Sequence, residues 1–128
     1  MTEELQKVIT KAKDCLEDAK YLMDGERYDA AVNRAYYSMF TAIQGLLLER
    51  NIFVKTHSGT KAKFHELFLK TELLPMHLGK IFEDAISLRQ EADYEFDEII
   101  SNEDAQQTIE DADLFIKSIV EFIEKTSK

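Results

Sequence analysis

Apolar side chains recur at three- and four-residue steps along almost the whole chain, and few residues interrupt this period. Only 4 Gly and 1 Pro occur among 128 residues, while Ala, Leu, Glu, Lys and Gln are abundant. These five residue types favour helices over strands. The sequence therefore predicts an all-α fold, an up-and-down antiparallel bundle of about five helices, with residues 1–128 as a single domain.

Breaks in the period separate the expected helices. Three starts carry a side-chain oxygen that can accept from a free backbone N–H, and one helix starts at proline, which suits a first turn. The expected bounds are, in chain order, the cap Thr2 to Asp24-Gly25, Tyr28 to about Arg50, the cap Ser58 to about Lys70, Pro75 to about Ala92, and the cap Asn102 onward.

The second expected helix carries small residues along one side, which allow neighbouring helices to approach closely. This stripe and the five amphipathic helices leave more apolar surface than a bundle of this size hides by itself, so we expect a homodimer. The stripe consists of Ala31, Ala35, Ser38, Ala42, Gly45 and Leu46.

The acidic composition argues against broad nucleic-acid binding. The formal net charge is -9, and residues 91–113 contain ten carboxylates and no Lys or Arg. A protein that covers a duplex needs clustered basic side chains, so we expect no binding of bulk duplex DNA and only weak contacts in a small cleft. The acidic stretch is either a solvated surface or a docking surface for a basic partner.

The sequence shows no sign of export or of membrane insertion. No apolar run approaches the roughly 18 residues that a membrane span requires, and no leader precedes the first helix. Cys15 has no second cysteine with which to form a disulfide, and we expect it in the core of a protein from a reducing compartment. These features predict a soluble, cytoplasmic protein.

The segment NRAYYSMF places polar side chains beside the small-residue stripe. Asn33 and Tyr37 are four residues apart, and Arg34 lies three residues before Tyr37 and four before Ser38, so all share one sector of a helix. An arginine in an apolar helix is costly unless it is paired. Two interpretations remain open: a polar network that fixes helix register, and a ligand-binding site that includes Asn33, Arg34 and Tyr37.

A second candidate site lies in the segment SLRQEADYEF. Arg89 is expected at the inward edge of the fourth helix, where it could meet Arg34 or Asn33 across the bundle. Two converging guanidinium groups need an anion between them. Asp93 is one candidate for that anion, and a bound phosphate beside the Tyr94 hydroxyl is the other. Arg89 and Tyr94 are therefore the candidate catalytic residues.

The three histidines do not have the spacing of a metal site. His65 begins HELFL, in which Leu69 stands where a metalloprotease motif needs its second histidine. His57 and His77 are expected in loops without partners at ligand spacing. We therefore expect no metal and no cofactor, although Lys55 and His57 could line a site by folding back.

Four segments, in this order, resemble the HEPN-domain family, and specifically its small stand-alone prokaryotic proteins. They are NRAYYSMFTAIQGLLLERN, KTHSGTKAKF, LLP and LRQEADYEF, and the similarity covers roughly residues 5 to 125. The resemblance implies a helical bundle, usually homodimeric, with a polar site near the dimer cleft. It further implies that the chain is similar to metal-independent ribonucleases, often toxins, or to partners of minimal nucleotidyltransferase proteins.

The ribonuclease signature of that family is Arg, four to six residues, then His. Arg89 matches, but the permitted positions hold Tyr94, Glu95 and Phe96. Tyrosine is a poor general base near neutral pH, since its reference pKa is about 10. The resemblance also makes Tyr94 a candidate acceptor of a nucleotidyl group.

We therefore expect a HEPN module that works with a nucleotidyltransferase-type partner, as part of a toxin–antitoxin system. It would bind a nucleotide or an RNA end at Arg34, Tyr37, Arg89 and Tyr94. The first alternative is a metal-independent endoribonuclease in which Tyr94 replaces the signature histidine. The second is a structural protein whose same residues only fix helix register.

Overall fold

The computed structural model describes residues 1–94 and 100–126, and within them it contains helices and no β-strand. The predicted all-α bundle of five helices is confirmed. The elements are α1 (Glu3–Asp24), α2 (Tyr28–Glu49), α3 (His57–Phe64), the single π-helical turn η1 (His65–Leu69), α4 (Met76–Tyr94) and α5 (Asn102–Thr126).

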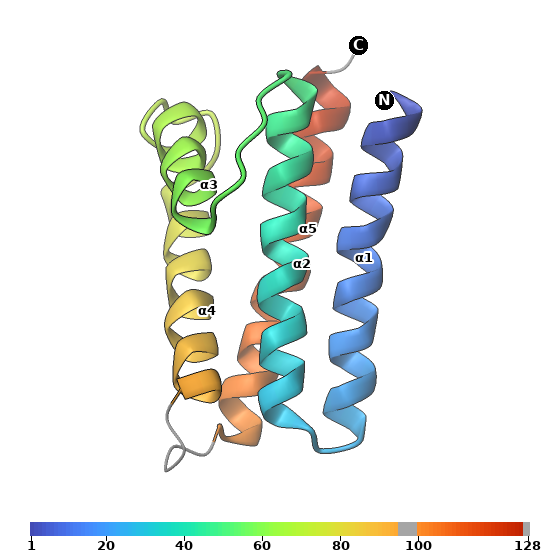
Figure 1. Ribbon diagram of the computed structural model, residues 1–128, viewed down its shortest axis with the longest axis vertical. Coiled ribbons are helices and arrows are strands. Elements are labelled where there is room, and N and C mark those ends of the chain that lie inside the picture. Colours follow the sequence, from blue (N-terminus) through green and yellow to red (C-terminus); the bar gives the residue numbers. More distant parts are fainter. Residues whose placement is uncertain (95–99, 127–128) are drawn as a thin grey trace.

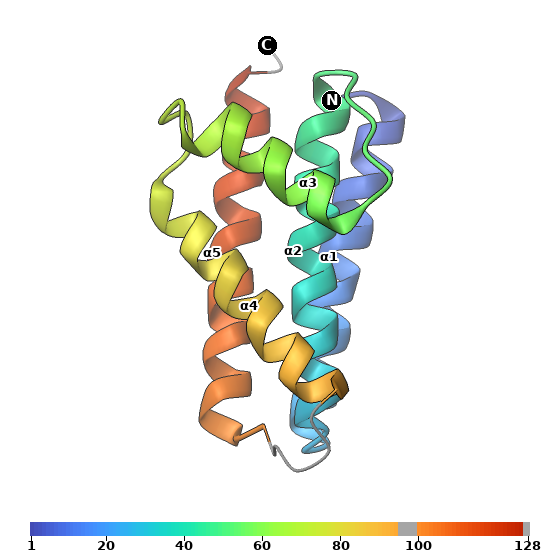
Figure 2. The same ribbon diagram turned by 60° about the vertical axis from the view of Figure 1, so that its left-hand side comes forward.

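Helix α2 lies at the centre of the bundle and packs against α1, α3, α4 and α5. Figure 1 shows α1, α2 and α5 running side by side, with both chain termini at the same end of the bundle. After α2 the chain crosses back along the bundle before α3 begins, and α3 and α4 are inclined to the other helices (Figure 2). This crossing brings the start of α3 beside the middle of α2.

The small-residue stripe of α2 is buried, as the sequence predicted. Ala31, Ala35, Ser38 and Ala42 are each 0% exposed. At Gly45 a Cβ atom would lie only 3.0 Å from the Ile9 side chain of α1. The lack of a side chain at Gly45 therefore allows the close approach of α1 and α2 at this point.

Two of the expected helix caps are wrong. Helix α3 is capped by Thr56, whose Oγ1 accepts from the Gly59 N–H at 2.9 Å, and Ser58 lies inside its first turn. The Asp104 N–H at the start of α5 donates to Ser101 Oγ, while the Asn102 side chain donates to the Tyr28 hydroxyl. In both segments an earlier hydroxyl takes the capping position. The predicted cap Thr2 is confirmed, since its side chain accepts from the Leu5 N–H.

Two further expectations about helix ends can be compared with the structure. Helix α1 ends at Asp24 as expected, and Gly25 returns its N–H to carbonyls of the last turn. The third predicted helix is interrupted, because the π-helical turn η1 replaces regular α-helix after Phe64. No helix in the described part of the chain is long and apolar enough to cross a membrane.

Replacing Gly45 by Val should lower the free energy of unfolding by about 1–3 kcal/mol, because the added carbons overfill the α1–α2 contact. The neighbouring change Gln44→Val is the matched control. Gln44 is exposed on the same helix, so its replacement should stay within about 0.5 kcal/mol of the wild type. Urea unfolding measures both, and equal stabilities for the two variants would contradict close packing at Gly45.

Removing the cap of α3 should also be measurable. Thr56→Ala should cost about 1 kcal/mol, because the Gly59 N–H loses its acceptor. Ser58→Ala should change the free energy of unfolding by less than about 0.5 kcal/mol. A larger loss for Ser58→Ala than for Thr56→Ala would restore the cap that the sequence suggested.

Candidate functional site

Two adjacent tyrosines of α2 form the base of a polar site between α2, α4 and the start of α3. We call the rings of Tyr36 and Tyr37 the tyrosine platform. Tyr36 is only 2% exposed and its ring stacks on Phe82 of α4, with centroids 5.7 Å apart and planes 9° apart. Tyr37 is partly exposed, and its ring meets Tyr36 edge-on. One ring is therefore fixed in the core while the other reaches the surface.

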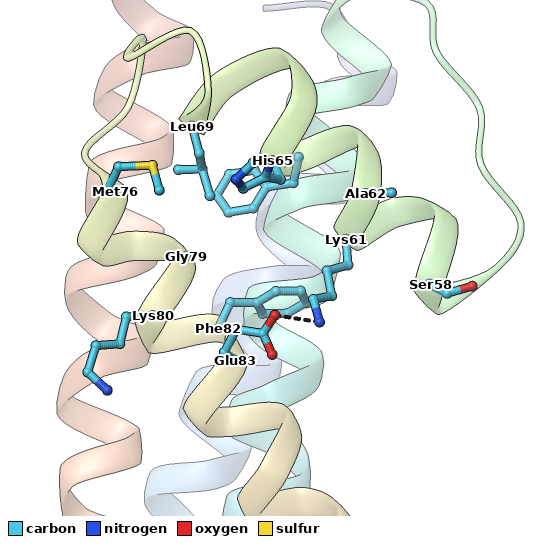
Figure 3. A pocket seen from close by; sticks show the side chains of 11 residues that line it. Ser58, Lys61, Ala62, His65, Leu69, Met76, Gly79, Lys80, Phe82 and Glu83 are labelled. Atoms are coloured by element: carbon cyan, nitrogen blue, oxygen red, sulfur yellow. Dashed lines mark ion pairs between the residues drawn. The ribbon is translucent and has the colours of Figure 1, made fainter.

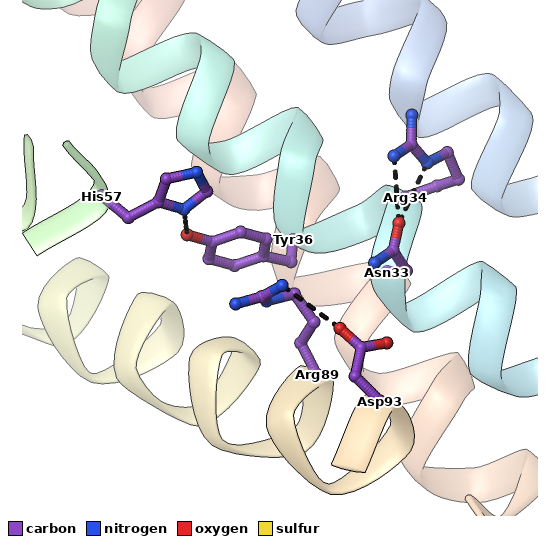
Figure 4. Close-up of polar contacts among 6 residues, drawn as sticks. All are labelled: Asn33, Arg34, Tyr36, His57, Arg89 and Asp93. Carbon is purple, nitrogen blue, oxygen red and sulfur yellow. Dashed lines mark hydrogen bonds and ion pairs between the residues drawn. The ribbon is translucent and has the colours of Figure 1, made fainter. Parts of the chain in front are cut away.

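Arg89 of α4 lies against this platform. Its guanidinium carbon is 4.7 Å from the Tyr36 ring centroid and 5.9 Å from that of Tyr37. Figure 4 shows the Arg89 head beneath the Tyr36 ring, with one nitrogen directed at Asp93. That ion pair measures 3.2 Å from Nη1 to the Asp93 carboxylate. The Nε atom is buried and has no hydrogen-bond partner among the described residues.

His57 reaches the opposite edge of the platform from the first residue of α3. Its Nδ1 is 2.6 Å from the Tyr36 hydroxyl oxygen. Its ring stacks on Phe40 at a centroid separation of 4.2 Å, with 17° between the planes, and meets Tyr37 edge-on at 5.8 Å. The residue as a whole is exposed to solvent. His57 thus folds back to line the site, one of the possibilities that the sequence left open.

The two arginines approach the same ring but have different polar partners. Arg34 lies 5.0 Å from the Tyr37 centroid and donates to Asn33 Oδ1 through Nε and Nη2, at 3.3 and 3.0 Å. Figure 4 draws this pair apart from the Arg89–Asp93 pair. Arg89 meets the tyrosine rings, whereas the sequence suggested contact with Arg34 or Asn33.

Other residues singled out in the sequence occupy different positions. Ser38 is buried and donates to the Ala35 carbonyl of its own helix, so it faces the core and not the site. Lys55 lines a separate hollow beside Leu48 and Phe53. Tyr94 is the last residue of α4, and its side chain, like residues 95 and 96, lies outside the described residues.

His65 and His77 are both exposed. His65 lies in η1, within the predicted third helix, whereas His77 lies in α4 and not in the expected loop. His57 also begins a helix. Among the described residues, no three His, Cys, Asp or Glu side chains are grouped as metal ligands. The polar groups at the platform are those of Arg89, Asp93, His57 and the tyrosine hydroxyls.

A cavity of about 690 Å³ lies on the far side of Phe82, between α3, η1 and α4. Phe64, Leu69, Met76 and Phe82 give it apolar walls, and Figure 3 shows Lys61 paired with Glu83 at its edge. Lys80, also at the edge, pairs with Asp84. Because its lining is mainly apolar, this cavity suits an anion less than the platform does.

Sequence reasoning missed Tyr36 and gave His57 no defined partner. One signal was available, because a tyrosine beside the apolar stripe of a buried helix needs a partner for its hydroxyl. No polar residue one turn away on α2 forms a hydrogen bond with the Tyr36 hydroxyl. The partner of this hydroxyl therefore has to come from another element. The identity of that partner required the path of residues 50–56.

Burial in the core raises the pKa of the Tyr36 hydroxyl above its ordinary value. The nearby Arg89 charge opposes this effect by favouring the phenolate, and Tyr37 adds to the increase. Burial has the largest effect, so Tyr36 remains a neutral phenol at physiological pH. A neutral hydroxyl can both donate and accept a hydrogen bond, and either role suits its contact with His57.

Comparison with known proteins gives a consistent result. The family model described as HEPN domain matches residues 5–123. The protein named Putative toxin MJ0142 of Methanocaldococcus jannaschii is 37% identical over 120 residues, covering 94% of this chain and 82% of that one. A UPF0332 protein of Thermotoga maritima is 36% identical over 118 residues, covering 89% and 86%. The protein named Putative toxin MJ0605, also from Methanocaldococcus jannaschii, is 34% identical over 117 residues, covering 91% and 87%.

The raised pKa of Tyr36 predicts a specific loss of stability in alkali. Folding favours the protonated phenol, so this contribution is fully present below the unfolded-state pKa of about 10 and is lost as pH rises through the higher folded-state pKa. The stability difference between wild type and Tyr36→Phe should therefore be constant up to about pH 9 and shrink above about pH 10. Denaturant unfolding across this range measures it. The control Tyr21→Phe, at a residue 80% exposed, should show no such change.

Proposed function

Because this chain belongs to the HEPN-domain family, we propose that it is the HEPN component of a toxin–antitoxin pair. We propose further that it binds the phosphate of a nucleotide or of an RNA end at the tyrosine platform. The single observation that carries the binding proposal is the state of Arg89. This guanidinium is partly buried on two aromatic rings and has one carboxylate partner among the described residues.

The burial of Arg89 prepares it for an anion. Its side chain is 17% exposed, so much of the cost of removing the cation from water is already met in the folded protein. Contacts with the faces of two tyrosine rings compensate part of that cost and hold the fork in one orientation. A phosphate that reaches this fork meets oriented donors, and little further ordering is needed.

Asp93 does not prevent such binding. Its bond to Arg89 is a single contact at 3.2 Å between residues four apart on one helix, and the Asp93 side chain is 33% exposed. Pairs of this kind contribute only about 0.3–0.5 kcal/mol when exposed. A phosphate offers several oxygens to the same fork, and bidentate contacts to arginine are stronger than single ones.

The acidic sequence that follows Arg89 restricts what can bind. Residues 91–113 contain ten carboxylates and no Lys or Arg. Two of them pair with basic residues elsewhere in the chain, Asp93 with Arg89 and Asp113 with Lys20 and Lys117. A long nucleic acid would bring its phosphates close to these charges, whereas a nucleotide or a chain end brings few. This distribution favours a small or terminal ligand over a duplex.

The remaining parts of the proposal come from the relatives and from the family resemblance. Two relatives carry the name Putative toxin, which supports a role for this chain beside an antitoxin. We assign that partner to the nucleotidyltransferase type, with the HEPN chain as a homodimer. Asn33, Arg34 and Tyr37 are proposed to contact the ligand beside Arg89, and Tyr94 to supply a hydroxyl or accept a nucleotidyl group.

Arg89→Ala should weaken binding of a short single-stranded RNA with a terminal phosphate by roughly 10- to 100-fold, the value of one or two charge-assisted contacts. Arg50→Ala is the matched control, because Arg50 also lies over an aromatic ring, 4.4 Å from the Phe68 centroid, but at the opposite end of α2 from the platform. It should leave affinity unchanged. Fluorescence anisotropy with labelled RNA measures both, and equal affinities for wild type and Arg89→Ala would refute the site.

A further inference from the structure

The cavity between α3, η1 and α4 has the size and the lining of a small-molecule site. Its volume is about 690 Å³, and Phe64, Leu69, Met76 and Phe82 form its apolar walls. Ligand sites in proteins commonly enclose about 300–1,000 Å³ and combine mainly apolar walls with a few polar groups. This cavity lies apart from the tyrosine platform, on the other side of Phe82.

The aromatic walls of the cavity are already fixed in place. Phe64 and Phe82 are only 1% and 2% exposed, and their rings meet edge-on with centroids 6.3 Å apart. Phe82 is also stacked on Tyr36 at 5.7 Å and on Phe115 at 6.0 Å. Core rings therefore hold Phe82 from behind, so an occupant would meet a rigid wall and would not have to order it.

The π-helical turn η1 and a glycine of α4 shape the upper part of the cavity. Within η1 the Lys70 N–H donates to the His65 carbonyl at 2.8 Å, the wide turn that often occurs at functional sites. Leu69 of η1 lies against the bare backbone of α4, where a Cβ atom on Gly79 would be 2.7 Å from Leu69 Cδ1. This contact brings η1 close to α4 along one wall and places His65 beside it.

His65 offers the cavity a polar group that is not already used. Its imidazole is exposed and forms no hydrogen bond with any side chain or backbone group in the described ranges 1–94 and 100–126. Figure 3 shows it close to Leu69, whereas Lys80 extends away and Lys61 is engaged with Glu83. A neutral imidazole carries one donor and one acceptor, so it can bond either kind of ligand group.

Charge and extent limit the kind of occupant. An ionised group placed against the phenylalanine walls would lose its hydration without a matching partner, which is costly. A protein partner would need about 800 Å² of contact surface on this chain. Of the residues that line the cavity, only Met76, at 56%, is an exposed large apolar side chain, and charged Lys80 and Glu83 border it. These features favour a small, uncharged ligand.

We propose that this cavity binds an uncharged aromatic molecule between Phe64 and Phe82, with one polar group of the ligand hydrogen-bonded to His65. Phenylalanine rings pack well edge-on or offset against another ring, and the Met76 sulfur adds a favourable contact with an aromatic edge. The inference goes beyond the proposed phosphate site and does not depend on it, since the two sites use different faces of Phe82.

The test uses two fluorescent probes with the same rings and the full chain. N-phenyl-1-naphthylamine is uncharged and has one N–H group, and 8-anilinonaphthalene-1-sulfonate adds a sulfonate to it. The variants His65→Phe and Met76→Ala alter the cavity. Their controls are His77→Phe, at an exposed histidine of α4 outside the lining, and Leu114→Ala, at a residue 46% exposed on α5.

Two further measurements complete the test. Phe53→Ala reports on the separate hollow that Phe53 lines. Displacement of the bound uncharged probe by 1-naphthol and by 1-decanol compares an aromatic with an aliphatic competitor. Melting curves confirm that every variant is folded.

The wild type is expected to bind one uncharged probe per chain and the sulfonated probe at least about 10-fold more weakly, because the sulfonate would be buried against apolar walls. His65→Phe should weaken binding of the uncharged probe by about 2- to 10-fold, the value of one hydrogen bond. Met76→Ala should weaken it by about 5- to 20-fold through lost apolar contact. His77→Phe, Leu114→Ala and Phe53→Ala should bind like the wild type, and 1-naphthol should displace the probe at lower concentration than 1-decanol.

Several results would overturn the inference. Absence of saturable binding of the uncharged probe, or wild-type affinity in both His65→Phe and Met76→Ala, would remove the cavity as a site. Loss of binding in Phe53→Ala would place the probe in the other hollow. Equal or tighter binding of the sulfonated probe would contradict an uncharged ligand, and stronger displacement by 1-decanol would contradict an aromatic one.

Discussion

The central position of α2 is the constraint on which the rest of the structure depends. Thirteen of its 22 residues are buried, and it contacts four other helices. A helix covered on so many sides can carry only small or apolar residues, unless another element supplies partners for its polar groups. Alanine meets this condition at buried positions of α2, and Gly45 meets it on the face toward α1. Tyr36 does not, because its hydroxyl lies in the interior and needs a hydrogen-bond partner.

The partner of Tyr36 links the fold to the site. The hydroxyl reaches His57, which belongs to the segment that crosses back along the bundle after α2. The start of α3 is held there by the Thr56 cap, one residue before His57. The same contact therefore satisfies a buried polar group and places an imidazole at the surface.

Arg89 illustrates a related compromise. Arginine can lie on aromatic rings because its planar guanidinium is weakly hydrated, whereas the ammonium of lysine holds its water more strongly. The fork has five donors, and among the described residues only Asp93 accepts from it. Packing of α4 on α2 therefore leaves donor capacity that an anion could use. In our proposal that anion is a small or terminal phosphate, because the acidic sequence that follows Arg89 disfavours a longer polyanion.

The sequence by itself determined the local features of this protein. Apolar periodicity predicted the helices and the buried stripe of α2. The four-residue spacing identified Asp93 as a partner for Arg89. Both patterns depend on residues within one or two turns of the same helix, so the sequence alone reveals them. The family resemblance agreed with the matched domain.

Ser58 and Asn102 were wrong as caps because a hydroxyl one or two residues earlier was equally able to accept the same type of bond. Only the tertiary structure decided that Arg89 meets the rings of Tyr36 and Tyr37, while Arg34 pairs with Asn33. It also decided that His57 reaches Tyr36 from 21 residues away in the sequence. Helical period fixes which side of a helix a residue occupies, but the neighbour that it meets there depends on how the connecting segments cross and how the helices are inclined.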